Sequence, residues 1–300
     1  MPDEALPRIG IIGLGNAGGA MLEALSAHAS VLTYDRDSNR LNEVSRKCRI
    51  APVPIASSAE LARQAELIIL SLPTPEASRS VASEIRDHLG PGKMVVESST
   101  VSPEDVEALY ALISPTGARL IDIPLVGGVQ KLSEGQAVFL VGATENDAGI
   151  AGQVFNRIAA EVFYLGERAG GMRTKLIVNG VAHAVYVVLM EAGALAAVQD
   201  IPMSVIYRLL ERESGLMRPL AHRVGERLLN HDFEGGMSTA NACKDSGLIL
   251  DSARELGVPL FATAAAHGLF ELAMHEGLEK LDYASVGTLW EKWLGFSFTR

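Results

Sequence analysis

The segment RIGIIGLGNAG, residues 8–18, decides the fold of this chain. Residues 8–12 are mostly apolar and predict a buried strand, GLGNAG matches the pattern G-x-G-x-x-G, and a helix is expected to follow to about residue 27. Alone the pattern is weak, because 29 of the 300 residues are glycine. Here it lies between a strand and a helix, and Asp35 ends the next predicted strand, 22 residues after Gly13. This context indicates a dinucleotide-binding turn, with a purely structural strand–helix turn as the alternative.

Each glycine of the turn has a separate expected role. Gly13 permits the tight turn, Gly15 lets the backbone approach a pyrophosphate, and Gly18 lets the helix pack closely on the strand. The helix N-terminus offers free N–H groups to the phosphates. Asp35 can accept hydrogen bonds from the adenine ribose and would repel a 2′-phosphate, whereas Arg36 could pair with that phosphate or remain a solvated surface charge. We therefore expect NAD as the cofactor, with NADP as the alternative.

The rest of the chain predicts two domains. Further strands are expected at 30–35, 65–73, 92–100, 117–124 and 137–142, with helix-like segments between most of them. Such alternation predicts a parallel sheet covered by helices on both faces, and no strand is expected from about residue 169 onward. The prediction is an α/β fold, in which a Rossmann-type NAD(P)-binding domain over 1–167 is followed by an all-helical substrate and oligomerisation domain over 168–300, led by a long interdomain helix.

Composition excludes several classes of function. The formal net charge of −10 does not fit a nucleic-acid-binding protein, which would carry a basic face. Cys48 and Cys243 form no CxxC pair, and no cluster has metal-ligand spacing, so neither a metal site nor a structural disulfide is expected. The N-terminus lacks a basic region followed by an apolar run, so no signal peptide is expected. We therefore expect a cytoplasmic protein.

Residues 176–198 form a nearly continuous apolar segment, which is long enough to span a bilayer. It contains Asn179, His183 and Glu191, however, and no similar segment occurs elsewhere. We expect a buried central helix of a soluble protein rather than a membrane span. Glu191 is expected to make a structural hydrogen bond, because a buried carboxylate needs a partner.

Two segments could carry the chemistry. In AGGMRTKLIVN, residues 169–179, Lys175 and Asn179 are four apart and share a helix face. The spacing alone does not decide whether Lys175 extends to water or lies in a site. DIPLVGGVQK, residues 122–131, predicts a strand that ends in a glycine turn. The N–H groups of such a turn can bind an anion, although a simple turn would have the same sequence.

With these motifs the chain resembles, nearly end to end, the β-hydroxyacid dehydrogenases, the family of 3-hydroxyisobutyrate dehydrogenase and tartronate semialdehyde reductase in the 6-phosphogluconate dehydrogenase superfamily. GLGNAGGAM resembles the family's cofactor motif, DIPLVGG its substrate loop, AGGMRTKLIVN its catalytic motif, and Lys244-Asp245 its late Lys–Asp pair. Four motifs in the family's order make the resemblance specific.

The resemblance implies a reaction and a site. Hydride would pass between the nicotinamide and the hydroxyl-bearing carbon of a short 3-hydroxy acid. Lys175 would be the general acid/base, and Asn179 would hold the substrate or orient that lysine. Gly127 and Gly128, beside Val126, would bind the substrate carboxylate. The implied cofactor residues are Gly13, Gly15, Asn16, Ala17, Gly18, Asp35, Arg36, Leu72, Pro73, Thr100 and Lys244. Separately from the resemblance, a homodimer or homotetramer is expected, because the helical domain should carry apolar faces beyond its own core; no nucleic-acid or membrane partner is expected.

The chain departs from the family at three positions. Val126 stands where the family usually has serine, Ala169 replaces the first glycine of the lysine motif, and Met237 stands where relatives often carry an aromatic residue. Val126 and Met237 are expected near the substrate, so a more apolar pocket is expected, whereas Ala169 is expected to affect the loop before the helix. Two alternatives stay open. The first is an imine reductase that acts on a non-carboxylate substrate, although imine-reducing relatives usually replace the lysine that this chain keeps. The second is a non-catalytic nucleotide-sensing protein.

Overall fold

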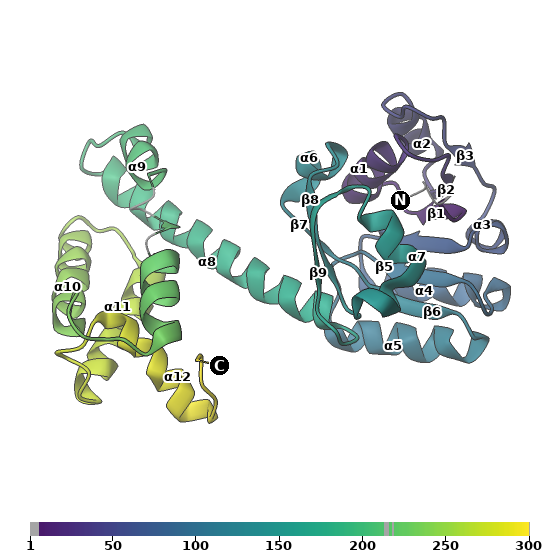
Figure 1. Cartoon of the computed structure of the whole chain (residues 1–300). Coiled ribbons are helices and arrows are strands. Elements are labelled where there is room, and N and C mark those ends of the chain that lie inside the picture. The colour runs from purple at the N-terminus through teal and green to yellow at the C-terminus, as the bar shows by residue number, and fades with distance from the viewer. Residues whose placement is uncertain (1–5, 213–215, 218, 300) are drawn as a thin grey trace. The chain divides into compact units, whose positions relative to one another are not determined.

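The computed structural model describes residues 6–212, 216–217 and 219–299 (Figure 1). Its contacts divide the chain into two compact units that meet in the sequence between Asn179 and Gly180. The first unit holds every expected site residue except Lys244. The second unit contains the C-terminal helices.

The first unit is built on a parallel sheet of six strands in the order β3-β2-β1-β4-β5-β6. The strands are β1 (Ile9–Ile12), β2 (Leu32–Tyr34), β3 (Val53–Pro54), β4 (Leu67–Leu70), β5 (Met94–Glu97) and β6 (Arg119–Asp122). Every residue of β1, β4 and β5 is buried, as expected for parallel strands covered on both faces. The predicted α/β fold is thus confirmed. The strand order reverses between β1 and β4, and ligands of such sheets bind at this switch point.

Helices connect the strands and cover the sheet. They are α1 (Asn16–Leu25), α2 (Ser38–Ser45), α3 (Ser58–Gln64), α4 (Pro75–Ile85), α5 (Pro103–Ile113), α6 (Gly128–Ser133) and α7 (Glu145–Phe155), with short 3-10 turns at Arg86–His88 and Ser114–Thr116. A side-chain oxygen of the preceding residue caps each of α2, α3, α4 and α5. Helix α1 instead follows Gly15, which has no side chain to act as a cap. Its first N–H groups are therefore left to water or a ligand.

Three strands form a second, smaller sheet in the order β7-β8-β9. They are β7 (Leu125–Val126), β8 (Ala137–Val141) and β9 (Ala159–Tyr164). The sequence predicted the strand at 137–142 but placed it in the main parallel sheet, and this placement was wrong. The chain reverses after Val126, so the short β7 pairs antiparallel with β8. The Gly142 N–H donates to the Asp122 carbonyl, and the two sheets are thereby joined next to β6.

Helix α8 (Gly170–Ala197) runs across the boundary between the units, and the other named elements after it lie in the second unit. They are α9 (Met203–Leu210), a π-helical segment (Pro219–Arg227), α10 (Thr239–Glu255), α11 (Phe261–His275) and α12 (Gly287–Leu294), with 3-10 turns at Leu228–Asn230 and Tyr283–Val286. Apart from one isolated bridge between Ser238 and Asp282, the described residues after Tyr164 form no β-structure. The expected change from α/β to all-helical structure is confirmed.

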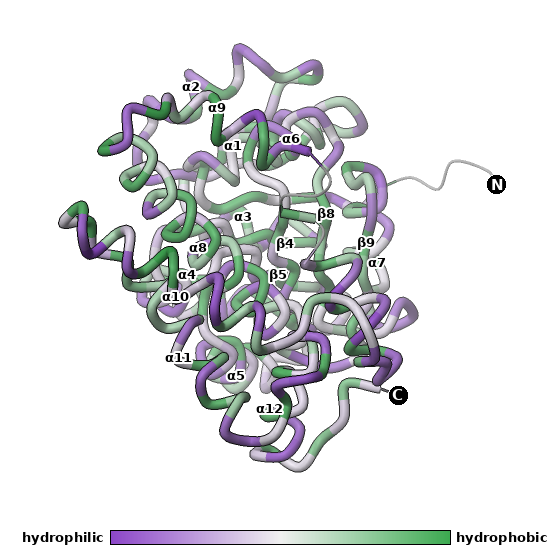
Figure 2. Tube along the Cα trace, turned by 90° about the vertical axis from the view of Figure 1, so that its left-hand side faces the viewer, coloured by the Kyte–Doolittle hydropathy of each residue, from purple (hydrophilic) through white to green (hydrophobic). Residues whose placement is uncertain are grey.

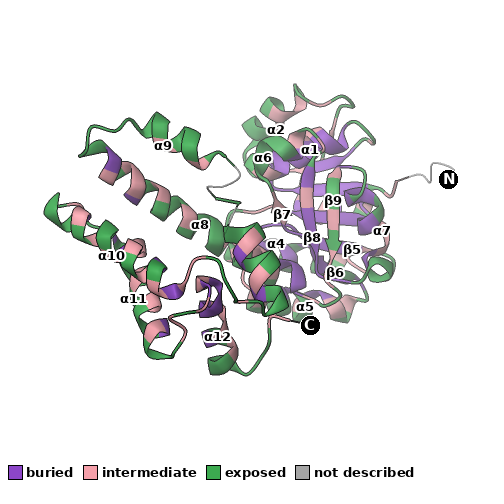
Figure 3. Cartoon of the chain, turned by 60° about the vertical axis from the view of Figure 1, so that its left-hand side comes forward, coloured by how far each residue is buried: buried purple, intermediate pink, exposed green. Residues whose placement is uncertain are grey.

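Helix α8 is not the buried central helix that the sequence predicted. Only 11% of its most apolar 18-residue window is buried, and by length and composition it could cross a membrane. Figure 2 shows apolar residues along the helix, and Figure 3 shows most of it as exposed or half-buried. Its one buried carboxylate, Glu191, accepts hydrogen bonds from the N–H groups of Ala262 and Thr263 and from the Thr263 hydroxyl. The expected structural role of Glu191 is confirmed, because it caps the start of α11.

Candidate functional site

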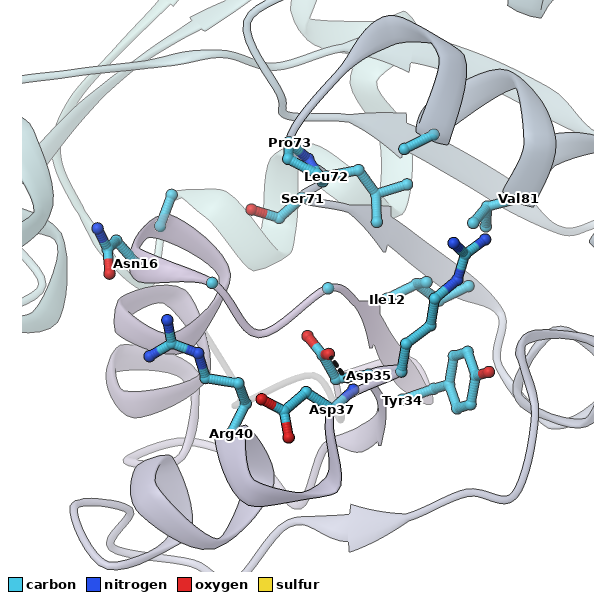
Figure 4. Close-up of a pocket in the computed structure, with 15 residues that line it drawn as sticks. Ile12, Asn16, Tyr34, Asp35, Asp37, Arg40, Ser71, Leu72, Pro73 and Val81 are labelled. Atoms are coloured by element: carbon cyan, nitrogen blue, oxygen red, sulfur yellow. Dashed lines mark hydrogen bonds between the residues drawn. The ribbon is translucent and has the colours of Figure 1, made fainter.

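A pocket of about 440 Å³ lies at the carboxyl ends of β1, β2 and β4, where the strand order reverses (Figure 4). Eight of the residues expected at the cofactor line it: Gly13, Gly15, Asn16, Ala17, Asp35, Arg36, Leu72 and Pro73. Ile12, Tyr34, Asp37, Arg40, Ser71, Ala77 and Val81 complete the lining. The predicted strand–turn–helix segment and the end of β2 therefore face one cavity.

The geometry of the glycine turn fits a dinucleotide. Gly13 has a φ of +96°, and a Cβ there would lie 2.2 Å from the Ser71 carbonyl oxygen. A Cβ at Gly18 would lie 2.0 Å from the Gly13 carbonyl oxygen, so α1 can approach the turn only with glycine at this position. Gly15 differs, since no atom lies within 4 Å of its ideal Cβ. The turn is thus packed on its inner side and open toward the pocket, where a pyrophosphate could approach the uncapped start of α1.

Asp35 is fixed at the end of β2 by the backbone. Its carboxylate accepts the Leu14 N–H at 2.6 Å and the Asp37 N–H at 2.8 Å. A carboxylate has lone pairs beyond these two bonds, so it can still accept from a ribose hydroxyl. Arg36 is exposed and 3.9 Å from Glu84, and Arg40 also lines the pocket. The site therefore offers an acceptor for hydroxyls and two guanidinium groups for a phosphate.

Leu72 and Pro73 form the pocket wall across from Asp37 and Arg40 (Figure 4). The Leu72 N–H donates to the Ser99 hydroxyl at 2.8 Å, and the Ser99 N–H donates to Oε1 of Glu97 at 2.8 Å. A chain of two hydrogen bonds thus joins the end of β5 to this wall. Thr100, expected at the cofactor, is exposed and does not line the pocket.

The helix that carries Lys175 is anchored by Asp122. This fully buried carboxylate accepts the Ala169 N–H at 2.9 Å and the Met172 N–H at 2.8 Å. Burial raises the pKa of Asp122, against the lowering effect of these backbone hydrogen bonds. Ala169, where the family has glycine, has a φ of +60°, in the left-handed region that L-residues seldom adopt. Asp122 ends the strand that leads to the VGG turn (residues 126–128), and the same residue therefore also fixes the start of α8.

Lys175 and Asn179 lie on α8, one and two turns beyond Met172. Both are half-buried, and the described residues offer neither side chain a hydrogen bond or ion pair. Burial lowers the pKa of Lys175. A half-buried amine with no ion-pair partner among the described residues is a candidate for general acid/base chemistry.

The VGG turn presents backbone rather than side-chain groups. Val126 is half-buried and pairs with Val138 in the small sheet. Gly127 and Gly128 are exposed, with φ of +102° and +85°, values that glycine adopts readily.

Lys244, on α10 of the second unit, is exposed and pairs with Asp245 at 2.8 Å. The described residues contain no group of side chains that could hold a metal ion.

Sequence reasoning missed several residues that shape this region, among them Ser71, Glu97, Ser99, Asp122 and Arg40. Their common signal is position, since most follow directly on the carboxyl end of a parallel strand, where the ligand edge of the sheet lies. Arg40 lies on α2 instead, and its distance from the glycine turn along the chain hides its place in the pocket.

Comparison with known proteins agrees with the fold and indicates a nicotinamide-dinucleotide cofactor. Residues 8–166 match the NAD binding domain of 6-phosphogluconate dehydrogenase, and residues 169–290 match the NAD-binding domain of NADP-dependent 3-hydroxyisobutyrate dehydrogenase. The mitochondrial 3-hydroxyisobutyrate dehydrogenase of Rattus norvegicus is 27% identical over 289 residues, which cover 93% of this chain and 85% of that protein. The L-threonate dehydrogenase of Cupriavidus necator is 28% identical over 274 residues, with 90% of this chain and 91% of that protein covered.

Among solved structures, an imine reductase from Pseudomonas sp. has a TM-score of 0.84 at 18% identity, over 94% of this chain and 99% of that chain. This likeness establishes the shared fold. The two domain matches together span most of the chain, in the order that the sequence predicted. The chain belongs to the NAD(P)-dependent β-hydroxyacid dehydrogenase family, in the 6-phosphogluconate dehydrogenase superfamily. It is an oxidoreductase with a nicotinamide cofactor.

Proposed function

We propose that this protein oxidises the hydroxyl group of a short 3-hydroxy acid, and reduces the corresponding carbonyl, with Lys175 as the general acid/base. The observation that carries the proposal is the state of Lys175: a half-buried amine with a lowered pKa and no partner among the described residues, on a helix anchored by Asp122. The two dehydrogenase relatives act on small hydroxy acids according to their names, which supports the substrate class.

The cofactor would supply hydride transfer, while the residues of this chain bind, orient and move the proton. The uncapped start of α1 would hold the phosphates, and Asp35 a ribose hydroxyl. In the oxidation direction, neutral Lys175 would accept the proton of the substrate hydroxyl. In the reduction direction, the ammonium form would return the proton and stabilise negative charge on the oxygen. A lowered pKa brings the neutral and charged forms closer in population near neutral pH.

The VGG turn would receive the substrate carboxylate through the N–H groups of Gly127 and Gly128. Val126 supplies no side-chain donor, so the grip on the carboxylate would depend on backbone groups alone. Asn179, one turn beyond Lys175, would orient the lysine or the substrate. Thr100 and Lys244 remain proposed cofactor contacts.

The preferred cofactor in this proposal is NAD. Asp35 would repel a 2′-phosphate, and Arg36, although it lines the pocket, is exposed and 3.9 Å from Glu84. Arg36 and Arg40 are the residues that could admit NADP. The Kd values of NADH and NADPH, measured by nicotinamide fluorescence, test this preference directly.

The experiment that tests the proposed reaction pairs a substrate panel with a lysine variant. Purified protein is incubated with a series of 3-hydroxy acids and NAD+, and nicotinamide absorbance is followed. Wild-type turnover of at least one acid is expected, and Lys175→Ala should reduce it by roughly 10²-fold or more while NADH affinity is kept. Reduction of a cyclic imine with no oxidation of any hydroxy acid would favour the imine reductase alternative. NAD binding without any turnover would favour a nucleotide sensor.

We also propose a cytoplasmic location and an assembly of two or four copies, a homodimer or homotetramer; the exposure of α8 supports the assembly. Ile177, Val181 and Tyr186 are each more than 60% exposed, and apolar surface of this extent is expected to be covered. A second copy of the chain is the proposed cover. Sedimentation equilibrium should give a mass of two or four chains, and Val181→Lys should lower it. A monomeric wild type, or one that partitions onto lipid vesicles, would contradict the oligomer.

A further inference from the structure

We infer that Glu97 is a positioning residue for the cofactor, because its carboxyl, through Ser99, holds the Leu72–Pro73 wall of the pocket. Glu97 is the last residue of β5 and has no exposed surface. It lies at the carboxyl edge of the sheet, where the cofactor pocket is located, but it does not line that pocket. Its effect on a bound cofactor would therefore be indirect.

The connection consists of two hydrogen bonds of 2.8 Å each. Oε1 of Glu97 accepts the Ser99 N–H, which fixes the loop that follows β5. The Ser99 hydroxyl accepts the Leu72 N–H, which fixes the loop that follows β4. Leu72 is followed by Pro73, which has no N–H of its own, so this bond is one of few ways to hold the segment by its backbone. A change at Glu97 can therefore move the pocket wall.

The other oxygen of Glu97 lies near a second buried polar group, the hydroxyl of Ser78 on α4. Oε2 is buried and has no hydrogen-bond partner among the described residues, and the same holds for the Ser78 hydroxyl on α4. The Ser78 hydroxyl is nevertheless close enough to lower the pKa of Glu97. The hydroxyl can donate to an ionised Oε2 or accept from a protonated one, so either state can satisfy these two buried atoms. An ionised Glu97 would leave a buried charge without a cation.

Among the described residues, no unpaired cation faces Glu97. Its register neighbours are Leu70 on β4 and Asp122 on β6, so all three side chains share one face of the sheet. From the covering helices the charged groups are Asp105 on α5, which raises the pKa of Glu97, and Arg79 on α4, which is paired with Asp105. Burial is the largest effect and raises this pKa to about 7. The carboxyl therefore changes charge near neutral pH.

Cofactor affinity should then depend on pH through Glu97. Below pH 7 the protonated carboxyl can hold Ser99 and donate to Ser78, so the Leu72–Pro73 wall is fixed. Above pH 7 the buried charge favours rearrangement or entry of water, which loosens the wall. The pocket lining contains no histidine or cysteine, the side chains that most often titrate in this range.

The test is NADH binding by fluorescence at pH 6.0 and 8.5, without any substrate. The wild-type Kd is expected to rise by about threefold or more between these pH values. In Glu97→Gln the amide can accept from Ser99 and donate to Ser78, so its Kd should stay near the wild-type value at pH 6.0. Ser99→Ala cuts the connection and should raise the Kd at both pH values. Glu104→Gln, at an exposed glutamate on α5, is the matched control and should keep the wild-type profile.

The same pH dependence in Glu97→Gln as in the wild type, or a flat wild-type profile, would overturn the role of Glu97. An unchanged Kd in Ser99→Ala would overturn the connection to the pocket wall. The inference uses the family's cofactor binding but not the proposed substrate. Failure to oxidise any 3-hydroxy acid would therefore contradict the proposed function and leave the NADH result intact.

Discussion

Replacing Asp122 by alanine should destabilise the protein strongly, because two buried N–H groups depend on this carboxylate. Asp122 has no exposed surface and accepts from Ala169 and Met172 at 2.9 and 2.8 Å. A buried donor left without its partner costs about 1–3 kcal/mol. Two such donors predict a loss of about 2–6 kcal/mol, toward the lower end if water fills the space. Since α8 carries Lys175, kcat should fall as well, while NADH affinity should change little.

The assay is urea unfolding followed by circular dichroism, with steady-state kinetics on the same preparations. Ser102→Ala is the comparison variant, because Ser102 caps α5 at a half-buried site. Loss of such a cap typically costs about 1 kcal/mol. The reasoning about Asp122 is refuted if Asp122→Ala loses no more stability than Ser102→Ala, or if kcat is unchanged.

Three further predictions concern charge, cofactor and packing. The pKa of Glu97 is raised from its ordinary 4.5 to about 7, so between these pH values the folded state holds a proton that the unfolded state has lost. This difference contributes about 3 kcal/mol to the unfolding free energy. The contribution should be fully present below pH 4.5 and should be lost as the pH rises through 7. Urea unfolding of Glu97→Gln at a series of pH values should not show this loss. The same change of unfolding free energy with pH in the variant and the wild type would contradict the prediction. Asp35→Asn should tighten NADPH binding by about tenfold, because a charge near the 2′-phosphate is removed; an unchanged NADPH Kd would argue against that role. Gly142→Ala should cost about 2 kcal/mol or more in unfolding free energy, since its Cβ would lie 1.9 Å from Oδ1 of Asp122; wild-type stability would show that the site can adapt.

Much of the α/β unit could be predicted because its signals are local. A strand, a glycine turn and a helix follow one another within residues 8–27, and buried strands are apolar along their length. The small sheet was harder to predict, because β7 has only two residues and its pairing with β8 depends on a reversal at Gly127. Periodicity in so short a strand carries no information.

Site residues that belong to a sequence motif could be predicted. Site residues whose role depends on contacts between distant parts of the chain could not. Asp35 follows from the spacing of the nucleotide motif. The anchoring role of Asp122 does not, because its two donors lie 47 and 50 residues away in the chain. The left-handed backbone of Ala169 gives a physical account of why the family has glycine there. Its buried methyl group packs with Val101 and Met172, which offsets part of the strain.

The burial of α8 could not be predicted from its sequence for a different reason. An apolar helix in the sequence predicts burial, but it does not reveal whether the same chain or another copy provides the cover. Glu191 was assigned correctly because any buried carboxylate needs donors, wherever they come from.

We propose above all that Lys175 accepts the proton of a hydroxy acid while the nicotinamide of bound NAD+ would accept the hydride. The most direct measurement is the pH profile of kcat for 3-hydroxy acid oxidation by the wild type, with kcat of Lys175→Ala and Lys175→Arg measured at the optimum. The account predicts that wild-type kcat rises as the pH passes through a lowered lysine pKa, and that both variants lose roughly 10²-fold or more while they bind NADH normally. Wild-type turnover in either variant at this pH would contradict it.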